Sequence, residues 1–186
     1  LAARVDGAVV DLSSALSGNS VVEPLRFDSA EGREVYRHSS THLMAQAVKE
    51  LFPSAQLTIG PALEDSFYYD FAFERPFTPE DLQRIEERAA EIIKRNRAIT
   101  RREFSKQDAI DFFTSRGEHY KVELIQGFPD GEPITAYTQG DFVDLCRGPH
   151  LPSTGVIGAI KLLTTGGAYW RGDERNPMLQ RIYGTS

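Results

Sequence analysis

Apolar side chains recur at helical spacing in two stretches of the first hundred residues. In residues 34–52 they favour one side of a helix, which Pro53 ends. The second helix is the clearer of the two. Thr78 can cap it and Pro79 occupies its first position, and the apolar residues that follow share one face opposite a charged one. A third, shorter helix is expected over 105–113.

Short runs of β-branched and aromatic residues between glycine and proline turns predict strands. The runs are 8–10, 21–22, 56–59, 67–73, 121–125, 134–138, 142–146, 159–163 and 168–170. Residues 28–32 have the composition of a linker, which places a domain boundary near residue 30. We therefore expect an α+β fold in which helices pack on an antiparallel or mixed sheet.

The composition fits a globular protein and indicates the cellular compartment in which it is expected. The chain is 40% hydrophobic and 26% charged, and no apolar run approaches the ~20 residues of a membrane helix. No export signal follows Leu1. Cys146 is the only cysteine, so an internal disulfide is excluded and a reducing, cytoplasmic setting is expected.

The net charge of −6 argues against a protein whose main task is to hold nucleic acid electrostatically. An RNA partner must therefore meet a local basic patch, or be held by another domain. The candidates for such a patch are Arg147, Lys161, Arg171 and Arg175. Trp170 could stack on a base, although a single tryptophan more often packs in a core.

Three of the four histidines and the only cysteine fall into two short strings. HSSTH holds His38 and His42, which share one face of a helix because they are four residues apart. CRGPH holds Cys146 and His150 on either side of a tight turn. This concentration predicts one shared site.

Three chemistries could use such a site. The first is zinc, for which two histidines, a cysteine and another histidine make a complete four-ligand set. The second is a cysteine–histidine nucleophile pair. The third is a metal-free site where imidazoles orient and activate water. HSSTH lacks the glutamate of the zinc-protease string, so the peptidase mechanism is disfavoured.

The two strings, with others, closely resemble bacterial threonyl-tRNA synthetases in the region before their catalytic domain. The matching stretches are RHSSTHLMAQAVKELFP, IGPALEDSFYYDF, SRGEHYKV, FVDLCRGPH and GGAYWRGDERNPMLQRIYGTS. Paired motifs of this kind also occur in alanyl-tRNA synthetase editing domains, but the last stretch favours the threonyl branch. The resemblance covers most of the chain.

The resemblance implies a domain layout and an activity. Residues 1–30 would be part of a ubiquitin-like TGS domain with a β-grasp fold, and 31–186 an editing domain of the threonyl/alanyl-tRNA synthetase second additional type. The chain would be a fragment unable to make threonyl-tRNA, and its parent a homodimer through domains absent here. Its task would be to hydrolyse the ester of Ser-tRNA(Thr), because one missing methyl, worth ~1–3 kcal/mol, is too little for the synthetic site to exclude serine.

Site roles also follow from the resemblance. The editing pocket would be lined by His38, His42, Cys146 and His150, with Lys121 from the string EHYKV assisting catalysis. Water attack would be assisted by His38 and Lys121, and Lys121 or amides near Gly148 would stabilise the oxyanion. Substrate contacts are expected from Asp144, Tyr69, Arg147 and Gly148. His119 is expected to be incidental.

The resemblance favours a metal-free site, with zinc held by His38, His42, Cys146 and His150 as the alternative. Two other functional classes compete with the hydrolase. One is a zinc-stabilised module that recognises the tRNA acceptor end without catalysis. The other is a free-standing trans-editing protein, which a start inside a TGS-like segment argues against.

Overall fold

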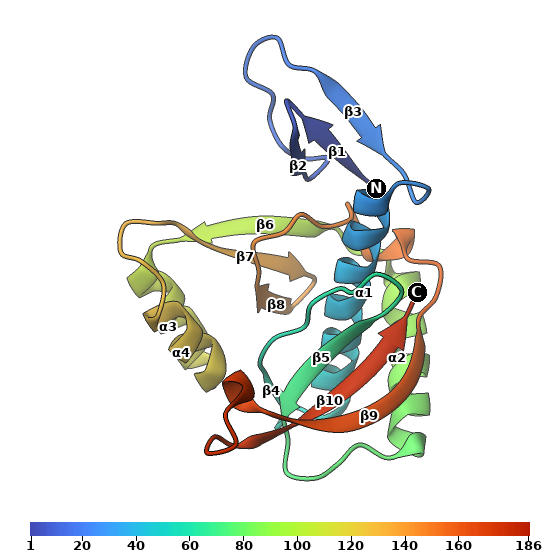
Figure 1. Ribbon diagram of the computed structural model, residues 1–186, viewed down its shortest axis with the longest axis vertical. Coiled ribbons are helices and arrows are strands. Elements are labelled where there is room, and N and C mark those ends of the chain that lie inside the picture. The colour runs from blue at the N-terminus through green and yellow to red at the C-terminus, as the bar shows by residue number, and fades with distance from the viewer.

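The computed structural model describes residues 1–186 as four α-helices and three antiparallel sheets (Figure 1). The helices are α1 (Ala30–Leu51), α2 (Pro79–Arg95), α3 (Lys106–Ser115) and α4 (His119–Gln126), with short 3-10 turns at Thr154–Val156 and Trp170–Gly172. The strands are β1 (Ala2–Val5), β2 (Ala8–Val10), β3 (Val22–Leu25), β4 (Gln56–Leu57), β5 (Phe67–Ala72), β6 (Ile99–Phe104), β7 (Ile134–Gln139), β8 (Phe142–Leu145), β9 (Lys161–Tyr169) and β10 (Met178–Thr185). The expected α+β class is confirmed.

Helix α1 runs through the middle of the molecule (Figure 1). Every residue from Ser39 to Val48 is buried, so this part of the helix is covered on all sides and has only a weak amphipathic pattern. The polar side chains inside it are satisfied locally, since the hydroxyls of Ser40 and Thr41 donate to the carbonyls of Tyr36 and Arg37. The SST of HSSTH therefore belongs to the interior of the fold.

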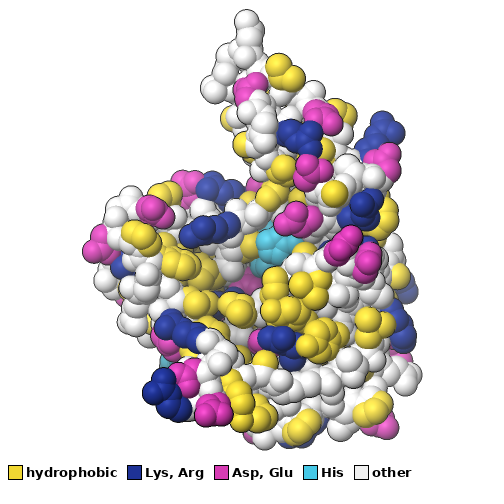
Figure 2. All heavy atoms as spheres, viewed as in Figure 1, with side chains coloured by type: hydrophobic (Ala, Val, Ile, Leu, Met, Phe, Trp, Pro, Cys, Tyr) yellow, Lys and Arg dark blue, Asp and Glu magenta, His cyan; other side chains and the backbone are white.

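The main core lies between α1, α2 and the sheet of order β4-β5-β10-β9. Helix α2 is amphipathic and begins with the predicted cap, in which Thr78 and Asp81 form a capping box. A second, smaller core lies between α3, α4 and the sheet of order β6-β7-β8. These two layers stand on either side of α1 and leave a hollow between them (Figure 2).

The first 25 residues form a separate three-stranded sheet of order β2-β1-β3 that projects from the body (Figure 1). Its base is attached to the main core, to which Ala2 and Leu25 belong. Arg4 forms an ion pair with Glu31 in the first turn of α1. None of the helices combines the length and the hydrophobicity that a membrane crossing requires.

Several predicted elements are wrong. Residues 121–125 lie in α4, because Lys121 and Ile125 are buried on one helical face. The stretches 159–163 and 168–170 were predicted as separate strands, but β9 is continuous through Gly166 and Gly167, which pair with β10.

The expected linker at 28–32 is also wrong, because α1 starts at Ala30 with Ser29 as its N-cap. Gly32 permits this start. A Cβ atom at this position would lie 1.8 Å from the carbonyl oxygen of Arg26. Three strands are not predicted by the sequence. β1 is positioned by pairing with β2 and β3, β6 by pairing with β7, and β10 by pairing with β5.

Replacing Gly32 with alanine is expected to lower the free energy of unfolding by about 1–3 kcal/mol, because the backbone around Arg26 must move. Gly127→Ala is the matched control, since the nearest atom to its added Cβ lies at 3.4 Å. Urea unfolding of the two variants measures the difference. Equal midpoints would contradict the close approach described here.

Candidate functional site

The two strings found in the sequence meet in space. Helix α1 presents His38 and His42 on one face, with ring centroids 5.2 Å apart. Cys146 follows β8, and a turn through Gly148 and a cis Pro149 brings His150 back beside it. One ligand atom from each of these four residues lies within 4.8 Å of the other three. The convergence predicted from the sequence is confirmed, whereas the role of each residue stays a prediction.

Hydrogen bonds hold the cluster together. The Sγ atom of Cys146 lies 3.3 Å from His38 Nε2 and 3.2 Å from His150 Nε2. On the other side of its ring, His150 Nδ1 is 3.0 Å from the hydroxyl of Ser39. That hydroxyl also accepts the backbone N–H of Leu151. Ser39, in the buried middle part of α1, therefore fixes the orientation of the His150 ring.

This donor set fits a zinc ion. Imidazole nitrogens and cysteine sulfur are ligands that zinc takes in proteins, and the four atoms here lie within 4.8 Å of one another. The Ser39 contact to His150 Nδ1 resembles the outer hydrogen bond that orients metal-binding histidines. The cluster can therefore hold a metal ion, with all four positions supplied by the protein.

Burial decides the protonation of the cluster. It lowers the pKa of His38, although the nearby Asp144 carboxylate acts in the opposite direction. Burial and the neighbouring imidazoles also hold the pKa values of His42 and His150 well below the ordinary value. For Cys146, burial raises the pKa to about 12. The imidazoles are therefore neutral and the thiol is protonated near pH 7, which disfavours a thiolate nucleophile.

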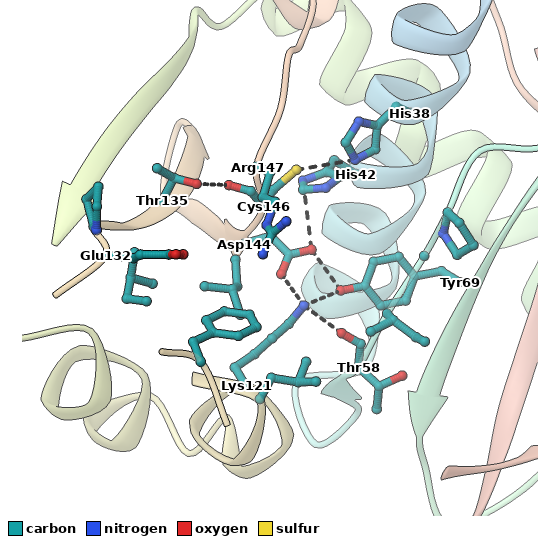
Figure 3. A pocket seen from close by; sticks show the side chains of 18 residues that line it. His38, His42, Thr58, Tyr69, Lys121, Glu132, Thr135, Asp144, Cys146 and Arg147 are labelled. Carbon is teal, nitrogen blue, oxygen red and sulfur yellow. Dashed lines mark hydrogen bonds and ion pairs between the residues drawn. The ribbon is translucent and has the colours of Figure 1, made fainter. Parts of the chain in front are cut away.

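A second group of polar residues lies beside the cluster (Figure 3). Lys121 Nζ is 2.5 Å from Asp144 Oδ1, and it donates to the Thr58 carbonyl at 2.7 Å and the Tyr69 hydroxyl at 3.0 Å. The Tyr69 hydroxyl donates to Asp144 Oδ2 at 2.7 Å, and His42 Nδ1 lies 3.8 Å from the same oxygen. Lys121, Asp144 and Tyr69 are all buried. Asp144 thus connects the lysine to the histidine cluster.

Members of both groups line one cavity of about 380 Å³. Its polar end is formed by His38, His42, Cys146, Asp144, Lys121 and Tyr69, and its other walls include Ile59, Pro61, Leu124, Phe128 and Ile134. Figure 2 shows histidine side chains in the middle of this face, surrounded mainly by hydrophobic ones. A ligand with one polar reactive end and a larger apolar or aromatic part suits this shape.

The other predicted substrate contacts differ in their placement. Arg147 is exposed, lines the cavity and lies over the Phe128 ring at 5.9 Å. The backbone N–H of Gly148 donates to Cys146 Sγ at 3.2 Å, so it is already engaged. His150 is buried in the cluster and does not line the cavity.

The remaining basic candidates and Trp170 lie outside the cavity. Lys161 pairs with Glu86, Arg171 with Glu123 and Arg175 with Asp173. Trp170 is buried and its indole N–H donates to Glu123, so its ring is not free to stack on a base. Of the four basic candidates, only Arg147 lines the cavity.

Sequence reasoning missed several residues of the site. Thr58 offers only its backbone carbonyl, which no side-chain pattern reveals. Ser39 lies inside a quoted string, and its position one residue after His38 was the available signal. Asp11 and Tyr137 contact the CRGPH turn from distant parts of the chain and carried no sequence signal.

The comparisons first define a class. Residues 134–183, which include β7, β8 and the CRGPH turn, match the family described as the threonyl and alanyl tRNA synthetase second additional domain. The expected domain type is confirmed for this part of the chain.

Whole-chain relatives make the assignment more specific. The chain is 59% identical over all 186 residues to a threonine–tRNA ligase of Acidithiobacillus ferrooxidans, and 56% identical to that of Symbiobacterium thermophilum. A third, from Aromatoleum aromaticum, is 54% identical. The chain therefore belongs to the threonine–tRNA ligase family, and it spans 29% of the length of each of these relatives.

Stability is expected to fall as the pH is lowered from 7.5 to 5.5. The unfolded histidines gain protons near their ordinary pKa of about 6.5, whereas those with a lowered folded pKa do not. Stability is therefore complete above about pH 6.5 and is lost below it, by up to ~1.4 kcal/mol per pH unit for each histidine.

Urea unfolding at several pH values, with a chelator present, tests this expectation. His42→Gln removes one of the buried rings and is expected to flatten the slope. His119→Gln, on the exposed surface of α4, is the matched control and should keep the wild-type slope. An unchanged slope in His42→Gln would argue against a neutral, buried His42.

Proposed function

We propose that this chain hydrolyses the ester bond of Ser-tRNA(Thr), as the editing part of a threonine–tRNA ligase. The observation that carries the proposal is the meeting of neutral imidazoles and the Lys121–Asp144 pair at the polar end of one cavity. Ester hydrolysis needs a base for water and a positive group near the developing oxyanion. Both are present within this single cavity.

The substrate follows from the limits of binding selectivity. Serine lacks one methyl group of threonine, a difference worth only ~1–3 kcal/mol in a pocket built for the larger side chain. A second site that admits the smaller side chain and blocks the methyl group supplies the missing accuracy. The seryl group would occupy the polar end, and the terminal nucleoside the wall formed by Ile59, Pro61 and Phe128.

His38 is the proposed base. It is the less buried of the two α1 histidines, it lines the cavity, and its lowered pKa keeps it neutral near pH 7. It would take a proton from water as the oxygen attacks the ester carbon. The tetrahedral intermediate would then release the ribose oxygen, which receives that proton from His38, leaving free serine and tRNA.

Lys121 would act mainly through its charge. Its three acceptors, the Thr58 carbonyl, Tyr69 and Asp144, occupy the ammonium group, so direct contact with an oxyanion requires exchange of one of them. A fixed positive charge beside the reacting ester still stabilises the intermediate. Asp144 balances that charge, and it would receive the seryl ammonium group beside Tyr69 and His42, the two residues that its Oδ2 atom faces.

A zinc-stabilised module that recognises the tRNA acceptor end is the second candidate, because the four ligand atoms suit the metal. A zinc ion would supply structural cross-linking of α1 to the CRGPH turn. Cys146, His42 and His150 would hold it together with His38, which could not then also act as a base.

For the domain layout, we propose that residues 1–30 are a TGS-like segment and 31–186 the editing unit. The projecting sheet and its separate strand pairing support this division.

Arg147 at the mouth of the cavity is the proposed contact for the RNA backbone.

The purified chain is expected to deacylate Ser-tRNA(Thr) faster than Thr-tRNA(Thr). His38→Ala should lower the rate about 10²-fold or more, because it removes the base. His119→Ala, the one histidine outside the cluster, is the matched control and should retain full activity. Release of labelled serine and threonine measures both rates, and equal hydrolysis of the two substrates would contradict the size-based sieve.

Metal content separates the two candidates. We expect deacylation to persist after dialysis against a chelator, with less than one zinc per chain by elemental analysis. Stoichiometric zinc, lost together with folding and with no deacylation before or after its removal, would instead support the recognition module.

A further inference from the structure

One side chain of the projecting N-terminal sheet reaches the candidate site. Asp11 follows β2, and its Oδ1 accepts the backbone N–H of His150 at 2.7 Å. Its Oδ2 accepts the hydroxyl of Tyr137 at 2.7 Å. These partners lie 139 and 126 residues away, so both carboxylate oxygens are used in long-range contacts.

Tyr137 and Asp11 together enclose the CRGPH turn. The Tyr137 ring packs 4.4 Å from the His150 ring. Its hydroxyl fills the place where a side chain at residue 148 would begin, since a Cβ on Gly148 would lie 2.0 Å from that oxygen. Asp11 thus binds the backbone of the CRGPH turn at His150, and it also binds Tyr137, whose ring packs against His150.

We infer that Asp11 is a positioning residue of the candidate site, and that the N-terminal sheet is therefore a structural part of that site. Ser39 fixes the His150 ring from α1, and Asp11 fixes the His150 backbone from the segment that follows β2. The inference rests on the proposed function only for its effect on the reaction rate. The effect on His150 itself is independent of any activity.

The geometry predicts graded effects for substitutions of Asp11. Asp11→Asn keeps a carbonyl oxygen for the His150 N–H, and its amide can donate to the Tyr137 oxygen, so the bridge survives without the charge. Asp11→Ala removes both contacts. Tyr137→Phe removes only the tyrosine hydroxyl. It therefore breaks one of the two contacts of Asp11 without changing any residue of the N-terminal segment. Asp28→Ala, whose side chain makes no hydrogen bond or ion pair, is the matched surface control.

Two measurements on the full chain test the inference. Imidazole NMR spectra report on the four histidines directly, and Asp11→Ala should shift the His150 signals and leave those of His119 in place. Deacylation of Ser-tRNA(Thr) should fall about 10- to 100-fold in kcat with little change in KM, because movement of His150 displaces Cys146 and, through its sulfur, the proposed base His38. Asp11→Asn should stay within about threefold of the wild type, and Tyr137→Phe should fall between the two.

Unshifted His150 signals in Asp11→Ala would overturn the inference. An Asp11→Asn variant as impaired as Asp11→Ala would also overturn it, since charge rather than the bridge would then be responsible. If the wild-type chain does not deacylate Ser-tRNA(Thr), the proposed function fails, and the NMR comparison still decides the role of Asp11.

Discussion

Burial of three imidazoles and a thiol against one another is the constraint on which the site depends. Taking an ionised group out of water is costly, so these side chains remain neutral and hydrogen bond among themselves. Ser39 satisfies the outward nitrogen of His150, and the Gly148 N–H satisfies the sulfur. A site built in this way is rigid, because its partners lie on two elements, α1 and the CRGPH turn, and neither can move without leaving a buried polar group unpaired.

The charged groups are kept next to the neutral cluster instead of inside it. Lys121 from α4, Asp144 from β8 and Tyr69 from β5 form a buried, electrically balanced group. A buried ion pair contributes little net stability, because its desolvation offsets its attraction. The arrangement is therefore better explained by what it does for the cavity, where it holds the ammonium group of Lys121 at a fixed position. Its three elements come from the two layers on either side of α1.

Local patterns in the sequence predicted those parts of the structure that depend on local interactions. The cap and amphipathic face of α2 were readable because Thr78, Asp81 and the apolar stripe act within one helix. The start of α1 was hidden, since Gly32 looks like a breaker until the close carbonyl of Arg26 is known. Helix α4 was mistaken for a strand because its eight residues include β-branched and aromatic types, and burial of Lys121 and Ile125 overrides that preference.

The residues of the candidate site also divide into those that a local sequence pattern reveals and those that it does not. His38, His42, Cys146 and His150 were found because rare residue types were concentrated in two strings. Lys121, Asp144 and Tyr69 were named only through the resemblance to a family, since nothing local marks a lysine that will be buried beside an aspartate. Asp11 was not found at all, because an aspartate after a short strand is common and its partners are more than a hundred residues away.

The same burial that keeps the imidazoles neutral also prepares them as metal ligands, so the cluster alone does not distinguish hydrolysis from metal binding. The two uses compete for His38, which cannot hold a metal through Nε2 and take a proton there. Lys121 and Asp144 favour the hydrolytic use. A closed structural zinc site has no need of a buried lysine–carboxylate pair opening on the same cavity, whereas ester hydrolysis needs charge at that place. The presence of this pair is therefore the stronger argument for a reacting substrate.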